Sequence, residues 1–145
     1  MKKILVGLDG SPRQASTLAA AAGLARRTGA KLVLFRGVGL PSDLPHDAYM
    51  MAPADVTKLL EERAKKALEE AAKTVPAEVV ERCHVVIGTP WQAVCRAATE
   101  LDVDLIVVGS HGYDTVDRIL GTTAAKIVNH ADRSVLVIRA GERLA

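Results

Sequence analysis

The chain has 145 residues, enough for one domain that buries a sizeable core. Its net charge of +2 and its aromatic content of 3% exclude the strongly basic, aromatic-lined surfaces of nucleic-acid-binding proteins. The apolar run Leu18–Ala25 is far shorter than a membrane span, and the apolar run after Lys3 is too short for a signal peptide. We therefore expect a single domain over residues 1–145 in the cytoplasm, in contact with neither nucleic acid nor membrane.

The first part of the chain alternates a strand pattern with a helix pattern. Ile4–Leu8 is a short apolar run that predicts a buried strand. Ser11-Pro12 predicts the start of a helix, because serine is a good N-cap and proline suits the first helical position. That helix is expected to end at Gly29. The next apolar run, residues 32–35, predicts the second strand.

A long irregular segment follows the second strand. Residues 37–53 contain three prolines and two glycines, which predicts a loop. Residues 54–75 have helical spacing, with one apolar face and a solvated face on which Glu69 and Lys73 are spaced for an ion pair. Pro76 ends this helix, and residues 79–88 predict the third strand.

The remainder of the chain repeats the alternation. Thr89-Pro90 predicts a helix start, and the helix runs to about Leu101. Residues 104–109 and 134–139 predict the fourth and fifth strands, with a helix over residues 123–130 between them. Continuous apolar strands that alternate with helices are typical of parallel sheets covered on both faces. We predict an α/β fold, a doubly wound, Rossmann-like five-stranded parallel sheet in the order 3-2-1-4-5 with helices on both faces.

Two glycine-rich strand ends are expected to meet in one crevice. In doubly wound sheets, ligands bind beyond the carboxyl ends of the strands, at the point where the strand order reverses. The strands that end at this point continue into Gly7-Leu8-Asp9-Gly10 and Gly109-Ser110-His111-Gly112, and Gly121-Thr122-Thr123 adds a helix start. Glycine N–H groups, hydroxyls and a helix N-terminus can hold a phosphate. They are also what ordinary turns and helix caps use, so both interpretations stay open.

Several other chemistries find little support. The Walker sequence and the dinucleotide fingerprint G-x-G-x-x-G are both missing. Asp9 can be a turn residue as well as a ligand-binding one. His111 has no visible nucleophile or acid beside it, so we expect no catalytic residue. Cys83 and Cys95 have neither a disulfide framework nor a zinc-ligand spacing, so we expect two buried thiols and no metal site.

Three blocks that cover nearly the whole chain carry a family pattern. They are "KKILVGLDGSPRQASTLAAAAGLARRTGAKLVLFRGV", "GTPWQAVCRAATELDVDLIVVGSHG" and "LGTTAAKIVNHADRSVLVIR". In these blocks the chain resembles the universal stress protein family. Gly109, Gly112 and Gly121-Thr122 are similar to the glycine motif of its ATP-binding branch, G-x2-G-x9-G-[ST].

The resemblance implies a role for each residue of the crevice. Asp9 would accept a hydrogen bond from a ribose hydroxyl or the adenine amino group, and Gly37 would meet adenine through its backbone. The glycines and hydroxyls after the fourth strand would hold phosphates. The implied binding residues are Gly7, Leu8, Asp9, Gly37, Gly109, Ser110, His111, Gly112, Gly121, Thr122 and Thr123. The resemblance also implies a homodimer that pairs through the edge strand Ser134–Arg139.

The chain departs from the family motif at one point. Eight residues lie between Gly112 and Gly121, one fewer than in the motif, and they include Asp114 and Asp117. These carboxylates would weaken triphosphate binding unless they face solvent or hold a divalent cation. The expected function is that of a stress-response switch or sensor that binds ATP, with Mg²⁺, and is not an enzyme beyond slow ATP hydrolysis. The alternative is a dimeric interaction protein of the same fold that binds no nucleotide.

Overall fold

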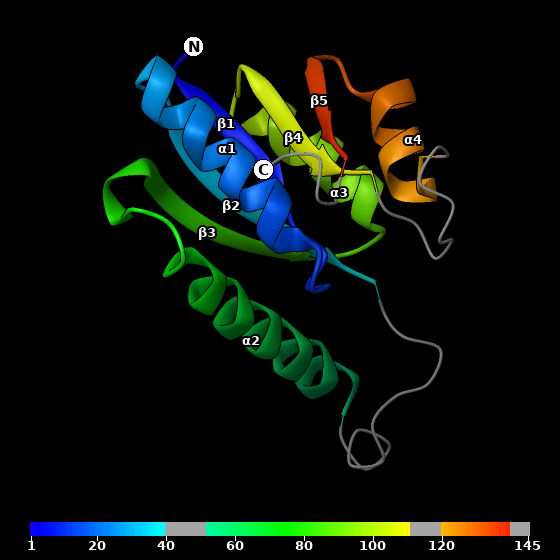
Figure 1. The fold of residues 1–145 in the computed structure, drawn as a ribbon. Helices are drawn as coiled ribbons and strands as arrows, with labels where there is room; N and C mark the ends of the chain where they lie inside the picture. Colours follow the sequence, from blue (N-terminus) through cyan, green and yellow to red (C-terminus); the bar gives the residue numbers. More distant parts are fainter. Residues whose placement is uncertain (40–51, 111–119, 140–145) are drawn as a thin grey trace.

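One parallel sheet organises the chain. The computed structural model describes residues 1–39, 52–110 and 120–139. These residues form five parallel strands in the order β3-β2-β1-β4-β5, which confirms the predicted α/β topology (Figure 1). The strands are β1 (Lys3–Gly7), β2 (Lys31–Val38), β3 (Val80–Ile87), β4 (Leu105–Gly109) and β5 (Ser134–Ile138). The connecting helices are α1 (Gln14–Thr28), α2 (Pro53–Ala72), the short 3-10 helix η2 (Ala77–Val79), α3 (Pro90–Glu100) and α4 (Thr122–His130).

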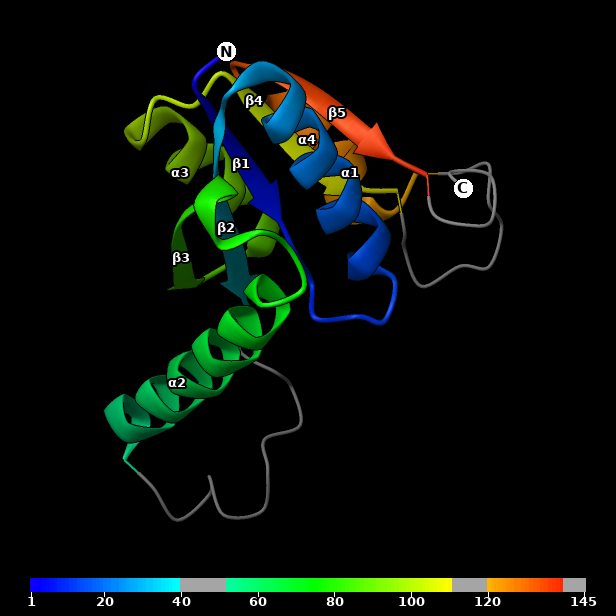
Figure 2. The ribbon, with the colours of Figure 1, turned by 60° about the vertical axis from the view of Figure 1, so that its left-hand side comes forward.

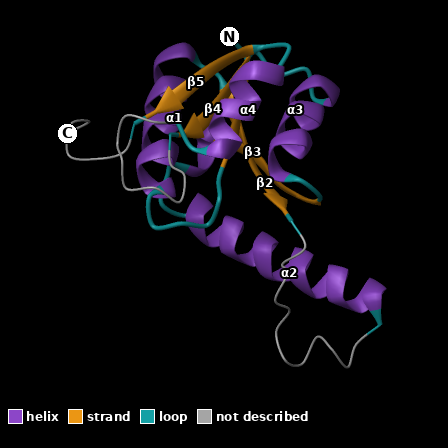
Figure 3. Ribbon diagram, turned by 90° about the vertical axis from the view of Figure 1, so that its right-hand side faces the viewer, coloured by secondary structure: helices purple, strands orange, loops and turns teal. Residues whose placement is uncertain are grey.

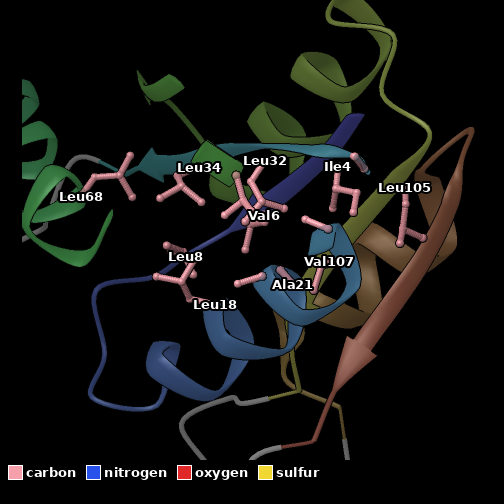
Figure 4. Close-up of a cluster of buried hydrophobic side chains, with 14 of the residues drawn as sticks. Ile4, Val6, Leu8, Leu18, Ala21, Leu32, Leu34, Leu68, Leu105 and Val107 are labelled. Atoms are coloured by element: carbon pink, nitrogen blue, oxygen red, sulfur yellow. The ribbon is translucent and has the colours of Figure 1, made fainter. Parts of the chain in front are cut away.

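The helices cover both faces of the sheet (Figure 3). Successive side chains of a strand point to opposite faces. Ile4 and Val6 of β1 therefore join a core with Leu18 of α1 and Leu68 of α2, as Figure 4 shows. Helix α2 extends beyond the sheet in Figure 2, and only part of its apolar face is buried.

The opposite face has a core of its own. Leu5 of β1 and Phe35 of β2 point to this side and pack with Val94 of α3 and Ile127 of α4. Apart from Phe35, the fully buried large side chains are aliphatic, as the low aromatic content predicts. No helix in the described part of the chain is long and apolar enough to span a bilayer.

The predicted start of the first helix is wrong. Helix α1 begins at Gln14, with Arg13 at the N-cap position, and not at Pro12. The residues before it form a turn closed by side chains. Ser11 N–H donates to Asp9 Oδ1 at 2.9 Å, and Gly10 N–H donates to Gln14 Oε1 at 3.0 Å. These acceptors stabilise the turn, so serine caps no helix here.

Other boundaries shift by smaller amounts. Strand β2 continues to Val38, because its pairing with β3 extends there, and Gly37 is therefore in a strand and not in the predicted loop. The predicted loop residues 40–51 lie outside the described residues. Lys73 forms its ion pair with Glu70 at 2.9 Å, and Glu70 is the residue after the predicted partner Glu69. Gly29 ends α1 as predicted, with a left-handed φ of 76°.

Candidate functional site

A cavity lies at the carboxyl ends of the central strands. Its volume is ≈ 730 Å³, within the range of small-molecule sites. It is bounded by the ends of β1, β2 and β4 and by the first residues of α1, α3 and α4. This is the crevice between β1 and β4, where the strand order reverses and where ligands bind in doubly wound sheets.

Most of the predicted site residues line this one cavity. They are Gly7, Leu8, Asp9, Gly37, Gly109, Thr122 and Thr123. Ser110 and Gly121 are buried behind them, and Gly121 N–H donates to the Ser110 carbonyl at 2.9 Å. That bond places the start of α4 directly beside the end of β4. His111 and Gly112 lie outside the described residues.

The β4 and α4 side of the cavity suits an anion. Helix α4 has Gly121 as its N-cap, no side chain among the described residues caps its first N–H groups, and its first turn carries no acidic residue. Thr122 and Thr123 begin the helix, and both are exposed. A helix N-terminus carries partial positive charge and free N–H donors, and the threonine hydroxyls add further donors. This side of the cavity can therefore bind a phosphate.

The wall formed by β2 and α3 is close-packed and partly apolar. A Cβ atom on Gly37 would lie 2.9 Å from Pro90 Cα and 3.3 Å from Ala93 Cβ. Only glycine lets the first turn of α3 approach the strand this closely. Pro90 and Val94 line the cavity from the same helix. The result is a partly apolar wall that a base can contact.

The turn after β1 supplies polar groups. Asp9 is exposed at the cavity, and one of its carboxylate oxygens accepts the Ser11 N–H. Its other oxygen is available to a hydroxyl or amino group of a ligand. The Ser11 hydroxyl oxygen is buried and has no hydrogen-bond partner among the described residues.

Two cations that line the cavity are not among the residues predicted from the sequence. Arg13 precedes α1, and Arg36 lies at the end of β2, directly before Gly37. The described lining residues thus carry two arginines and one carboxylate, Asp9. This excess of positive charge favours an anionic ligand. The position of Arg36 at the end of an apolar strand was a signal that could have been used, because the end of that strand was already expected to reach the crevice.

Features elsewhere in the described chain do not form a second reactive site. Cys83 and Cys95 are free and half-buried, less buried than expected, and burial raises the pKa of each thiol. A raised pKa keeps a thiol protonated and unreactive at neutral pH. No group of three or more His, Cys, Asp or Glu side chains that could hold a metal occurs within residues 1–39, 52–110 and 120–139.

Comparison with known proteins identifies a family. The model of the universal stress protein family matches residues 1–139. Universal stress protein A homolog 1 of Coxiella burnetii is 33% identical over 139 residues, which cover 94% of this chain and 95% of that protein. The structure of UspA from Lactobacillus plantarum is 25% identical, with a TM-score of 0.75 over 95% of this chain and 97% of that one. A universal stress protein solved in complex with cAMP is 25% identical, with a TM-score of 0.64 over 95% and 96%. The chain therefore belongs to the universal stress protein family.

Proposed function

We propose that this protein binds ATP in the cavity and acts in the cytoplasm as a stress-response switch or sensor. The observation that carries the proposal is the construction of one cavity from two unlike sides. Gly109 and the start of α4 form a side suited to phosphates, and Gly37 with Pro90 forms a side suited to a base. A relative that was solved in complex with cAMP supports an adenine nucleotide as the ligand class.

The proposed contacts follow from this division. The first backbone N–H groups of α4 and the hydroxyls of Thr122 and Thr123 hold the phosphates. Asp9 accepts a hydrogen bond from the ribose or from the adenine amino group. The base lies against the apolar wall formed by α3.

We propose that Mg²⁺ accompanies the nucleotide. Among the described cavity residues, Asp9 is the sole carboxylate, which is too few for a cation site built from protein alone. Mg²⁺ usually keeps several waters and binds through one or two carboxylates together with phosphate oxygens. When bound, it would neutralise part of the phosphate charge.

Binding, and not turnover, is the proposed activity. The hydroxyls in the described part of the cavity belong to Ser11, Thr17, Thr122 and Thr123, and no histidine or carboxylate among the described residues is hydrogen-bonded to them as a base. A serine or threonine nucleophile needs such a base. We therefore propose at most slow ATP hydrolysis, which fits a switch better than a metabolic enzyme.

Calorimetric titration with ATP and Mg²⁺ tests the proposal, together with analysis of nucleotide released from the purified, denatured protein. Asp9→Asn keeps an oxygen that can accept the Ser11 N–H but removes the charge, so we expect ATP affinity to fall about tenfold. Asp55→Asn on α2, away from the cavity, is the matched control and should leave affinity unchanged. Absence of heat at millimolar ATP, with no co-purified nucleotide, would contradict the proposal.

The alternative of a dimeric interaction protein has an observation of its own. Within the described sheet β5 is an edge strand, and Leu136 on it is 39% exposed. An apolar edge strand is a template for pairing with a second copy. We propose a homodimer through β5 in either case, and Leu136→Lys should shift the mass in solution, measured by light scattering, towards the monomer. A dimer that binds no nucleotide would favour the alternative.

A further inference from the structure

Arg36 is a cation inside the cavity, held against the turn that follows β1. A Cβ atom on Gly10 would lie 2.7 Å from Arg36 Nη1, 2.8 Å from Cζ and 2.9 Å from Nη2. The guanidinium group therefore covers the bare backbone of Gly10. The residue is half-buried and lines the cavity.

The guanidinium donors of Arg36 have no acceptor in the described part of the protein. No hydrogen bond or ion pair joins Arg36 to residues 1–39, 52–110 or 120–139. By contrast, Arg133 at the other end of the sheet donates to Asp102 at 2.8 Å, to Asp132 at 3.1 Å and to the Val103 carbonyl at 2.9 Å. Within the described residues this half-buried cation has no anionic partner, and an anionic ligand would supply one.

The location of Arg36 indicates which part of a bound nucleotide its guanidinium would contact. The phosphate-binding side of the cavity is at Gly109 and the start of α4, across the crevice from β2. Arg36 instead contacts Gly10, next to Asp9, the residue assigned to the nucleoside in the proposed function. An anion held by Arg36 would therefore be attached to the ribose and not to the 5′ phosphate chain.

We propose that Arg36 binds a phosphate on the 2′ or 3′ oxygen of the ribose, so that the cavity prefers adenine nucleotides phosphorylated at that position as well as at the 5′ oxygen. An arginine beside the ribose is the general solution for a 2′-phosphate in dinucleotide sites, because its planar fork matches two phosphate oxygens. Asp9 can accept a hydrogen bond from the ribose hydroxyl that stays free. This inference rests on the proposed nucleotide binding and adds a ligand class to it.

Titration calorimetry with three ligands tests the inference: AMP, adenosine 2′,5′-bisphosphate and adenosine 3′,5′-bisphosphate. We expect the wild-type protein to bind one bisphosphate about tenfold more tightly than AMP. The two bisphosphates show which ribose oxygen carries the phosphate. Arg36→Gln should bring the ratio of affinities close to one, because it lowers affinity for the bisphosphate more than affinity for AMP. Arg36→Lys should give an intermediate ratio, because lysine keeps the charge but loses the fork.

Arg82→Gln is the matched control. Arg82 lies on the neighbouring strand β3, its guanidinium contacts His84 Nδ1 at 3.2 Å, and it does not line the cavity, so the ratio should stay at the wild-type value. Thermal unfolding followed by circular dichroism shows that each variant is folded.

Three results would overturn the inference, and they differ from one another. Equal wild-type affinity for AMP and both bisphosphates would remove the ribose-phosphate preference and leave nucleotide binding intact. An equal loss of affinity for all three ligands in Arg36→Gln would place Arg36 at the base or the 5′ phosphate. Failure of the wild-type protein to bind any of them, or ATP, would refute the proposed function together with the inference.

Discussion

The two ends of the sheet are built from the same five strands in opposite ways. At the amino end, charged groups satisfy one another. The Asp104 carboxylate accepts the N–H groups of Lys2 and Lys3 at 2.7 and 2.9 Å, and Arg133 joins Asp102 to Asp132. At the carboxyl end, the described residues form a cavity lined by glycines, hydroxyls and arginines.

The difference separates stability from binding. Hydrogen bonds at the amino end link segments about a hundred residues apart in sequence, so they hold the fold together without a ligand. At the carboxyl end, the guanidinium of Arg36 and the first N–H groups of α4 have no side-chain acceptor among the described residues. Donors that the protein leaves unsatisfied are what a bound ligand can use. Substitutions at the two ends should therefore produce different kinds of effect.

The largest expected effect is at Gly37 on the cavity wall. A Cβ atom there would meet the backbone of Pro90 at 2.9 Å, so the first turn of α3 must move. We expect Gly37→Ala to lower the free energy of unfolding by about 2 kcal/mol, measured by urea denaturation. Gly39→Ala, where the nearest described atoms are 4.0 Å away, is the control and should change stability by less than about 0.5 kcal/mol. Equal effects of the two substitutions would show that α3 does not depend on Gly37.

The next largest effects are expected at two glycines with similar left-handed φ angles. Gly10 and Gly29 have φ values of 78° and 76°, but an added Cβ would meet Arg36 at Gly10 and no described atom within 4 Å at Gly29. We expect each alanine substitution to lower stability by about 1 kcal/mol, because L residues are strained in the left-handed region. Gly10→Ala alone should also displace the flexible Arg36 side chain and lower the preference for the bisphosphate over AMP. An unchanged ratio of bisphosphate to AMP affinity in Gly10→Ala would show that the ribose phosphate does not depend on Arg36.

A smaller effect is expected at the amino end of the sheet and depends on pH. Backbone hydrogen bonds from Lys2 and Lys3 lower the pKa of Asp104 below its usual value of 3.8. A carboxyl whose folded pKa is lowered stabilises the protein above its unfolded pKa, and this contribution is lost as the pH falls through the folded pKa. The wild type should therefore be more stable than Asp104→Asn at pH 7, with the gap closing below about pH 4. Because Asp104 is exposed, we expect this difference in the free energy of unfolding to be smaller than the effects of the Gly37, Gly10 and Gly29 substitutions.

The measurement is urea denaturation of both proteins across the acid range. Glu62→Gln on the exposed face of α2 serves as the charge-matched control, because no backbone N–H donates to it in the described structure. A gap between wild type and Asp104→Asn that stays constant from about pH 7 to about pH 2 would contradict the linkage, because the unfolded pKa of about 3.9 lies between these two values.

The smallest effect is expected at Ser11. Replacing a serine that caps a helix by alanine lowers the free energy of unfolding by about 1 kcal/mol. Here the Ser11 hydroxyl makes no hydrogen bond among the described residues, and its oxygen is buried. Ser11→Ala should therefore change the free energy of unfolding by less than about 0.5 kcal/mol, or stabilise the protein. A loss of about 1 kcal/mol or more would show that the hydroxyl has a partner in solution.

The two hydroxyl-proline pairs show where local sequence is sufficient. Thr89-Pro90 begins α3 as predicted, with Thr89 at the N-cap and Pro90 as the first helical residue. Ser11-Pro12 has the same local signal, yet α1 begins two residues later, at Gln14. The competing acceptors are Asp9 Oδ1 and Gln14 Oε1, which close the turn at the cavity. A propensity for capping is a weak preference, and these alternative hydrogen bonds override it.

The candidate site was partly visible in the sequence for a similar reason. Asp9 and Gly109 follow or end apolar strands, and the fold class places such positions at one edge of the sheet. Arg36 was missed because its role depends on contact with Gly10, which lies 26 positions away in the chain. No spacing rule connects these two residues, since strands β1 and β2 are brought together only when the sheet forms.

The sequence by itself determined the number and order of the strands, the two covered faces of the sheet and the strand ends that meet at the cavity. These features depend on hydrophobic periodicity and on the fixed handedness of crossover connections, and both are local or general properties of chains. Tertiary structure decided where α1 begins, how closely α3 approaches Gly37 and that Arg36 lies over Gly10. Each of these depends on which groups fill the space beside a residue after folding, so it is a property of packing and hydrogen-bond competition between distant segments.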